Sequence, residues 1–111
     1  MRIVNRKEFL TLPRNTLYCK FKEGDSFYNL NIKKDSLLND WYYLDLNNFD
    51  DCNNSNERYT KIDQMIKYSK VEFPLLLDSE DRDGFFEEGQ LFCIYDKKDI
   101  QNIIDNLTDC L

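Results

Sequence analysis

Carboxylates are the commonest side chains in this sequence that could take part in binding or chemistry, and they concentrate in its second half. The 111 residues include 21 Asp and Glu against 15 Lys and Arg, a formal net charge of −6. Exposed carboxylates form ion pairs with Lys and Arg of a partner and speed the encounter through a long-range field. The candidate partner-binding residues are Asp78, Glu80, Asp81, Asp83, Glu87 and Glu88, followed by Asp45, Asp50 and Asp51.

The charge is unevenly divided along the chain. Residues 1–34 hold eight basic and three acidic groups, a net charge of +5, whereas residues 35–111 hold seven basic and eighteen acidic groups, a net charge of −11. Acidity of this size also occurs in proteins that use it only for solubility. A field of one sign nevertheless suits a protein with a basic surface, such as a nucleic-acid enzyme whose cleft is lined by Lys and Arg. We therefore expect a basic protein partner, and no direct contact with nucleic acid.

A second set of residues suits a nucleotide. Aromatic side chains alternate with Lys and Asn along three segments, 16–22, 27–33 and 41–46. If these segments are neighbouring strands, one face presents stacking rings worth about 1–3 kcal/mol per base and a Lys for a phosphate. The alternative is that a helix or loop covers the face and the rings belong to the core, because strand register is not visible in a sequence. The candidate ligand-binding residues are Tyr18, Lys20, Trp41 and Tyr43.

Several chemistries have no support. The chain has no histidine, which excludes Ser/His/Asp and Cys/His catalysis. Its four cysteines form no C-x-x-C pair, so the spacing of a zinc site is missing. Cys19 and Cys93 lie within apolar alternation and are expected to be free thiols in the core. We predict a protein that is not an enzyme, with no catalytic residue, metal or cofactor.

Three helices are predicted from caps and periodicity. The first covers residues 6–12, because Asn5 and Glu8 form a capping box and Pro13 prevents continuation. The second is expected at residues 57–68. The third follows an Asp96 cap and carries apolar side chains at positions i, i+3, i+4 and i+7. These side chains are Ile100, Ile103, Ile104 and Leu107.

The third helix is expected to bury its apolar face against a sheet. A charge at Ile103 or Ile104 would then unfold the protein, because each buried aliphatic side chain contributes about 1.5–3 kcal/mol. The strands of that sheet are predicted at residues 16–22, 27–33 and 41–46, with an interior strand at 91–95. The first two strands read as a hairpin.

The remaining segments are predicted as irregular structure. Residues 78–89 are predicted to form a polar loop. In residues 71–77, which precede this loop, Pro74 limits any strand to an edge strand or an extended connector. The expected fold is a single α+β domain over residues 1–111. It has an antiparallel sheet of four or five strands, with two or three helices packed mainly on one face.

Two passages resemble known sequences. The opening, I-V-N-R-K-E-F-L-T-L-P-R-N-T-L-Y (residues 3–18), is similar to the start of a loose group of short, uncharacterised bacteriophage and prophage proteins. The stretch R-D-G-F-F-E-E-G-Q-L-F-C-I-Y-D (residues 82–96) resembles their C-terminal part. The resemblance implies an accessory phage protein acting in a bacterial cytoplasm. It transfers no functional residue.

Together these observations predict a non-enzymatic phage or prophage protein. It would bind a bacterial protein, such as a component of a defence system, through its acidic surface and interfere with it. A nucleotide-binding or signal-sequestering module that uses the aromatic face is the first alternative. A structural or assembly protein, whose acidic surface only maintains solubility, is the second.

Overall fold

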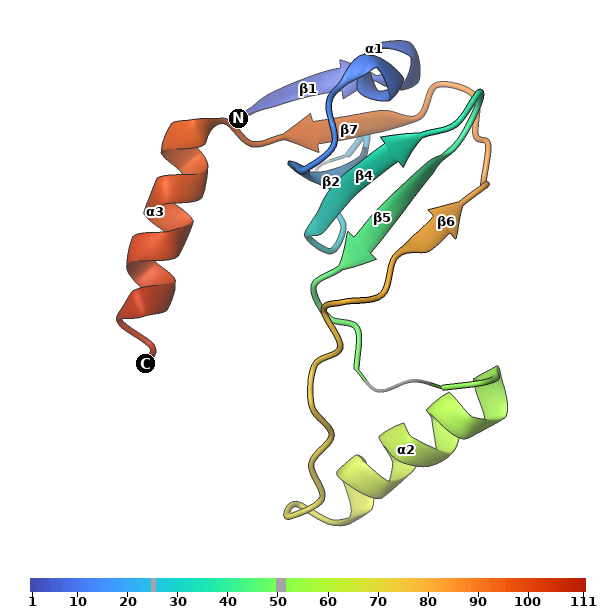
Figure 1. The fold of residues 1–111 in the computed structure, drawn as a ribbon, viewed down its shortest axis with the longest axis vertical. Coiled ribbons are helices and arrows are strands. Elements are labelled where there is room, and N and C mark those ends of the chain that lie inside the picture. Colours follow the sequence, from blue (N-terminus) through green and yellow to red (C-terminus); the bar gives the residue numbers. More distant parts are fainter. Residues whose placement is uncertain (25, 50–51) are drawn as a thin grey trace.

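A computed structural model describes residues 1–24, 26–49 and 52–111 of the chain as strands packed beneath one helix, with two helices projecting (Figure 1). The helices are α1 (Arg6–Thr11), α2 (Ser55–Lys67) and α3 (Lys97–Thr108). The strands are β1 (Arg2–Asn5), β2 (Thr16–Lys22), β3 (Ser26–Phe27), β4 (Asn31–Ser36), β5 (Trp41–Asp45), β6 (Asp81–Asp83) and β7 (Leu91–Ile94). The prediction of an α+β fold agrees with this arrangement.

The strands form one antiparallel sheet in the order β1-β7-β2-β4-β5-β6, with β3 pairing with the end of β2. Seven strands lie within the described residues, so the expected four or five was too low. The additional edge strands, β1 and β6, have four and three residues. Such short segments carry too little alternation to be recognised, and each becomes a strand only by pairing with a distant segment.

Two further predictions about strands were wrong. The segment 27–33 is not one strand: Phe27 pairs with Phe21, the chain then leaves the ladder, and Asn31 pairs with Tyr18. The segment 78–89 is not entirely loop, because Asp81–Asp83 forms β6 beside β5. Polar side chains are compatible with a strand here because β6 is at the edge of the sheet, where one side faces solvent.

The core lies between α1 and one face of the sheet. Phe9 of α1 stacks on Phe92, with ring centroids 3.9 Å apart. It packs edge-to-face with Tyr18 and Trp41, whose ring centroids lie 4.7 Å and 5.0 Å from that of Phe9. All four side chains are fully buried. Helix α1 begins as predicted, since the Asn5 side chain accepts a hydrogen bond from the backbone of Glu8. This cap directs Phe9 onto the sheet.

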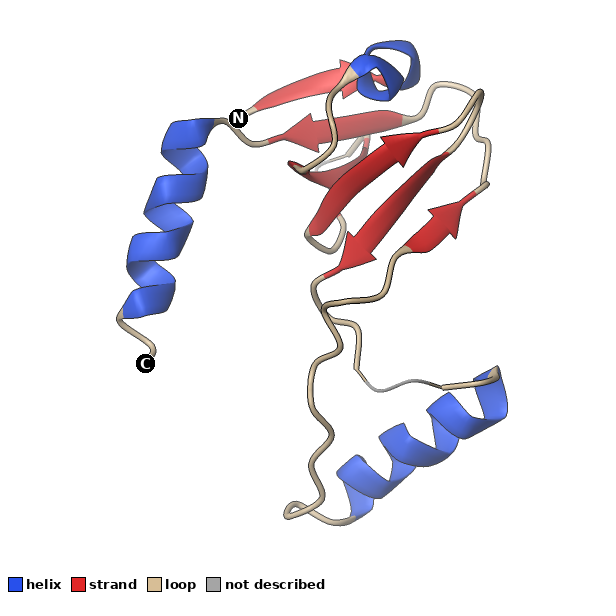
Figure 2. Cartoon of the chain, in the orientation of Figure 1, coloured by secondary structure: helices blue, strands red, loops and turns tan. Residues whose placement is uncertain are grey.

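The expectation that α3 packs against the sheet was wrong. Ile104 and Leu107 are 49% and 60% exposed, and no residue of α3 is buried. A connection of two residues separates the helix from β7, and the helix extends away from the sheet (Figure 2). Its first turn is held by the Met1 ammonium group, 2.7 Å from Asp99. Beyond Ile100, the apolar side of α3 therefore does not reach the sheet of its own chain.

Helix α2 also stands away from the sheet, at the tip of an arm that joins β5 to β6 (Figure 2). The two sides of the arm are tied by a backbone hydrogen bond from Leu76 to Asn48 and by a bridge between Phe49 and Leu75. The ring of Phe49 lies 6.3 Å from that of Phe73, and the Arg58 guanidinium group stacks over Phe49. The arm thus has a small apolar cluster of its own.

Candidate functional site

Several of the predicted partner-binding carboxylates do gather on one part of the sheet. Asp81 lies opposite Tyr43 in the β5–β6 register, and Asp83 lies opposite Trp41. The pKa of Tyr43 is raised, mainly by burial and further by the negative charges of Asp81, Asp83 and Asp45. The three carboxylates therefore lie near one half-buried phenol.

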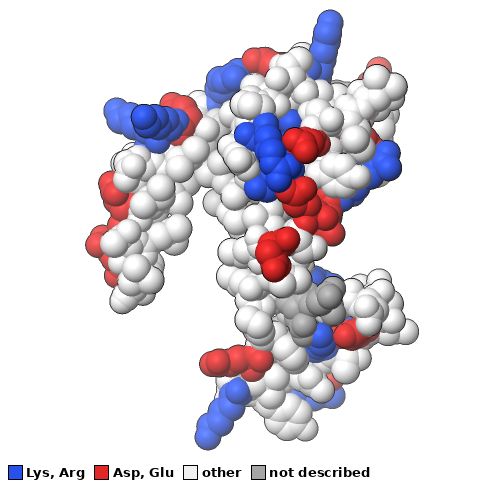
Figure 3. All heavy atoms as spheres, viewed as in Figure 1, with Lys and Arg blue, Asp and Glu red and all other residues white. Residues whose placement is uncertain are grey.

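Two more carboxylates extend this group. Glu80 precedes β6, and Asp35 lies near the end of β4. Both contact the guanidinium group of Arg14, the Asp35 contact at 3.1 Å. Figure 3 shows acidic side chains gathered over β4, β5 and the segment that leads into β6. We call Asp35, Asp45, Glu80, Asp81 and Asp83 the acidic band.

The acidic band is only partly neutralised. The Lys20 ammonium group lies 2.6 Å from Asp83, whose side chain is 10% exposed, so Asp83 is committed to an internal ion pair. Arg14 is shared between Asp35 and Glu80. Three of the five carboxylates are thus in contact with two cations. Within the described residues, Asp45 and Asp81 form no ion pair and are the carboxylates left to face a partner.

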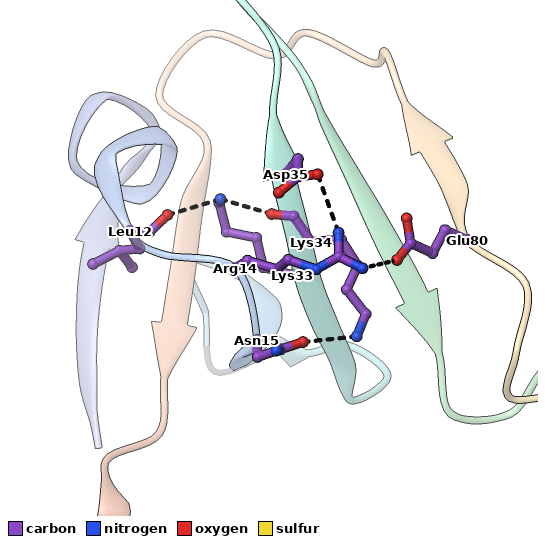
Figure 4. Close-up of polar contacts among 7 residues, drawn as sticks. All are labelled: Leu12, Arg14, Asn15, Lys33, Lys34, Asp35 and Glu80. Atoms are coloured by element: carbon purple, nitrogen blue, oxygen red, sulfur yellow. Dashed lines mark hydrogen bonds and ion pairs between the residues drawn. The ribbon is translucent and has the colours of Figure 1, made fainter.

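A buried lysine supports the β4 side of the band. Lys33 is 1% exposed, and its ammonium group donates to the backbone carbonyls of Leu12, at 2.8 Å, and Lys34, at 3.0 Å (Figure 4). Burial lowers the pKa of Lys33, and the charge of Asp35 opposes that shift. Leu12 is the residue that ends α1, so Lys33 neutralises the carbonyl end of that helix and fastens it to β4.

The sequence analysis missed one buried carboxylate. Asp40 is 9% exposed and lies 2.7 Å from the guanidinium group of Arg82, which reaches it from β6. The signal available in the sequence was Arg82, the single base among the acids of residues 78–88. This ion pair holds the edge strand β6 in place and thereby positions Asp81 and Asp83.

The other predicted acidic residues lie elsewhere. Glu87 and Glu88 are exposed on the loop between β6 and β7, outside the acidic band. Asp78 is exposed on the segment that leaves the α2 arm. Asp50 and Asp51 lie outside the described residues.

Two of the four residues predicted to form an aromatic ligand-binding face are buried in the core. Tyr18 and Trp41 are fully buried beneath α1, and the Trp41 indole N–H donates to the Tyr18 hydroxyl at 2.9 Å. The Arg6 guanidinium carbon lies over the Trp41 ring, 5.1 Å from its centroid. Neither ring can stack on a base, because Phe9 and its neighbours occupy their faces. For these two residues the alternative reading of the sequence holds: a helix covers this face, and the two rings belong to the core.

The other two members of that face, Lys20 and Tyr43, line a shallow hollow of about 200 Å³. Asn31 and Asp83 also contribute to it. Its cation is already paired, since Lys20 contacts Asp83. The hollow therefore offers no free positive charge to a phosphate.

The α2 arm presents apolar surface beside the acidic band. Tyr59 and Ile66 are seven residues apart, two helical turns, and are 70% and 76% exposed. Ile62 and Met65 of the same helix, in contrast, are half-buried. Exposed aromatic and aliphatic side chains of this kind are common in the centres of protein interfaces.

The cysteines are free thiols in the structure, and Cys19 and Cys93 are buried as predicted. They face each other across β2 and β7. Across residues 1–24, 26–49 and 52–111, no three Cys, Asp or Glu side chains are grouped in a way that could hold a metal ion.

No family model, curated protein or solved structure matches the chain. None of the helices in the described part of the chain has the length and hydrophobicity to cross a lipid bilayer.

Proposed function

We propose that this chain is a non-enzymatic phage or prophage accessory protein, which binds a bacterial protein with a basic surface and interferes with it. The observation that carries the proposal is the position of the acidic band next to the α2 arm. The band supplies a local negative field, with Asp45 and Asp81 unpaired, and the arm supplies exposed Tyr59 and Ile66.

The two surfaces would act at different stages of binding. Charged groups at the rim of an interface mainly accelerate and orient the encounter, whereas buried aromatic and aliphatic side chains slow dissociation. The acidic band therefore selects a basic partner, and Tyr59 and Ile66 hold it. The resemblance of residues 3–18 and 82–96 to phage proteins supports a bacterial host protein as that partner, met in the bacterial cytoplasm.

Capture from bacterial lysate at two salt concentrations tests the proposal. The chain should retain a host protein at low ionic strength and lose much of it at high ionic strength, because exposed ion pairs are screened over about 10 Å at 0.1 M salt. Capture that is unchanged between the two conditions would contradict a charge-driven interface.

A matched pair of variants tests which carboxylates supply the negative field that attracts the partner. Asp45→Lys/Asp81→Lys reverses the two unpaired carboxylates of the acidic band. Glu87→Lys/Glu88→Lys makes the same change in net charge on the β6–β7 loop. We expect the first variant to lose the host protein and the second to retain it. Equal losses would mean that net charge, and not the acidic band, governs binding.

The contribution of the arm is tested separately with Tyr59→Ala/Ile66→Ala. Neither side chain is buried, so this variant should melt at the wild-type temperature. Its host complex, measured by surface plasmon resonance, should dissociate faster with little change in association rate. A slower association with unchanged dissociation would show that the arm acts in the encounter and does not hold the bound partner.

A further inference from the structure

A hollow beside the β6–β7 loop is lined by rings and carboxylates that the proposed function does not use. Its volume is about 420 Å³, within the range of protein sites that take small molecules. We propose that this hollow binds a small organic cation of the alkylammonium class, through the faces of its rings and the charges of its carboxylates. The site does not depend on the proposed host partner.

Three aromatic rings form the apolar part of the hollow. Phe21 belongs to β2, Tyr28 follows β3, and Phe85 belongs to the β6–β7 loop. Tyr28 and Phe85 are 56% and 63% exposed, so much of each side chain is left uncovered by the protein itself. The face of an aromatic ring carries partial negative charge and attracts ammonium groups. Rings from separate segments around one hollow are typical of sites for such cations.

The segments that carry two of these rings are held in place before any ligand binds. The backbone N–H of Tyr28 donates to a carbonyl of β2 at 3.0 Å. The backbone N–H of Phe85 donates to the Asp83 carboxylate at 3.1 Å. Arg6 fastens the other end of the loop, because its guanidinium group donates to the side chain of Gln90 at 2.7 Å. A preformed hollow loses little conformational entropy when a ligand enters.

The ionised groups around the hollow favour a cation over an anion. Glu23 and Glu87 contribute to its walls, and neither forms an ion pair within the described residues. Of the two lysines in the walls, Lys20 is neutralised by Asp83 at 2.6 Å. Lys22 is exposed at the last position of β2. Among the wall residues, two unpaired carboxylates thus outnumber one unpaired lysine, in a chain whose net charge is −6.

A cation that bears alkyl groups suits both parts of this lining. Its methyl or methylene groups pack on the rings, while its charge is attracted to the ring faces and the carboxylates. A metal ion would need several oxygen ligands close together, and the described residues hold no group of three such side chains. Free metabolites and methylated lysine side chains share this alkylammonium head group.

Titration of the full chain with choline tests the proposal. The backbone amide chemical shifts of Gly89 and Leu91, which lie in the walls, should move with a dissociation constant on the order of 1 mM. Dimethylbutanol, in which carbon replaces the choline nitrogen, has the same shape without the charge and should bind about fivefold more weakly. Equal binding of the two molecules would overturn the proposal. Shifts no larger with choline chloride than with sodium chloride would also overturn it.

The same titration with a trimethyl-lysine peptide separates the two sources of the cation. Tighter binding of choline would assign the hollow to a free metabolite. Tighter binding of the peptide would assign it to a modified side chain of another protein. Because both molecules carry the same head group, absence of binding for both would overturn the site itself.

Substitutions at two neighbouring phenylalanines test the role of the rings. Phe85→Leu keeps an apolar side chain but removes a ring, and should raise the dissociation constant for choline about threefold to fivefold. Phe86→Leu is the matched control, because Phe86 is outside the walls of the hollow. Both side chains are mostly exposed, so both variants should melt at the wild-type temperature. Equal affinities of the two variants for choline would overturn recognition by the ring.

A second pair of variants tests the charge. Glu87→Gln removes a carboxylate from the walls with little change in shape, and should weaken choline binding about twofold to fivefold. Glu88→Gln makes the same change outside the walls and should have a smaller effect. Equal effects would mean that net charge governs binding, which would overturn the role of Glu87. Because choline binding needs no host protein, its failure would be distinct from failure of the proposed function.

Discussion

The indole N–H of Trp41 donates a hydrogen bond to the hydroxyl oxygen of Tyr18 at 2.9 Å, inside the core and away from water. The bond joins β2 to β5 across β4, which lies between them in the sheet. It gives two polar groups a partner at a place where an unpaired group would be costly. The same contact explains why two residues suited to stacking on a ligand instead hold the fold together.

Removal of the Tyr18 hydroxyl should destabilise the protein. In Tyr18→Phe the Trp41 N–H stays buried without its acceptor, so unfolding free energy should fall by about 1–3 kcal/mol. Urea denaturation followed by Trp41 fluorescence measures the change. Tyr59→Phe is the control, because Tyr59 is exposed and the same substitution there should have little effect. Equal stability of the two variants would contradict the role of this hydrogen bond.

Alkaline pH should unfold the protein through its buried tyrosines. Burial raises the pKa of Tyr18 above its usual value of 10.0, and burial also raises the pKa of Tyr95. Below pH 10 the phenols are protonated in both states and the full stability is present. As the pH rises further, the unfolded chain releases these protons first, and stability is lost. Urea midpoints measured from pH 8 to pH 11 should therefore fall at the alkaline end. Urea midpoints that stay constant over this pH range would contradict a role for the buried tyrosines in alkaline unfolding.

Lys33 should give the opposite dependence over a lower range. Burial lowers its pKa from the usual 10.5, so the unfolded state holds the proton more tightly than the folded state. Stability due to this group therefore rises with pH up to 10.5, by the sign of proton linkage. The stability of the wild type relative to Lys33→Met should increase between neutral pH and that limit. A constant difference in urea midpoints would show that Lys33 does not titrate differently in the two states.

Substitution in α3 should leave the fold intact. Ile104→Asp removes a side chain that is 49% exposed, so unfolding free energy in dilute solution should change by less than about 0.5 kcal/mol. Phe9→Ala, which removes a fully buried ring, should cost about 3–5 kcal/mol. Thermal melts of the two variants compare these effects. A large loss of stability in Ile104→Asp would show that α3 packs on its own sheet.

Local patterns were sufficient for much of the secondary structure. The Asn5 cap, the alternation of residues 16–22 and the Asp96 capping box each depend on residues within one or two turns, so α1, β2 and the start of α3 could be predicted. Burial of Cys19 and Cys93 followed from the same alternation. Clustering of acids in sequence also drew attention to Asp81, which is exposed, and to Asp83, which pairs with Lys20 inside the fold.

Long-range pairing could not be read from the sequence. Strand β1 exists because Val4 pairs with Phe92, and β6 exists because Asp81 pairs with Tyr43. Both contacts join segments far apart in the chain, and short segments of three or four residues gain strand structure only from such partners.

The sequence by itself determined which residues alternate, which helices are amphipathic and where negative charge accumulates, because these properties depend on near neighbours. The tertiary structure decided which face of the sheet is covered. Phe9 takes that place, so Tyr18 and Trp41 become core while Ile104 and Leu107 stay exposed. In this sheet α1 covers that face, and packing of distant segments, not periodicity, selected it over the more amphipathic α3.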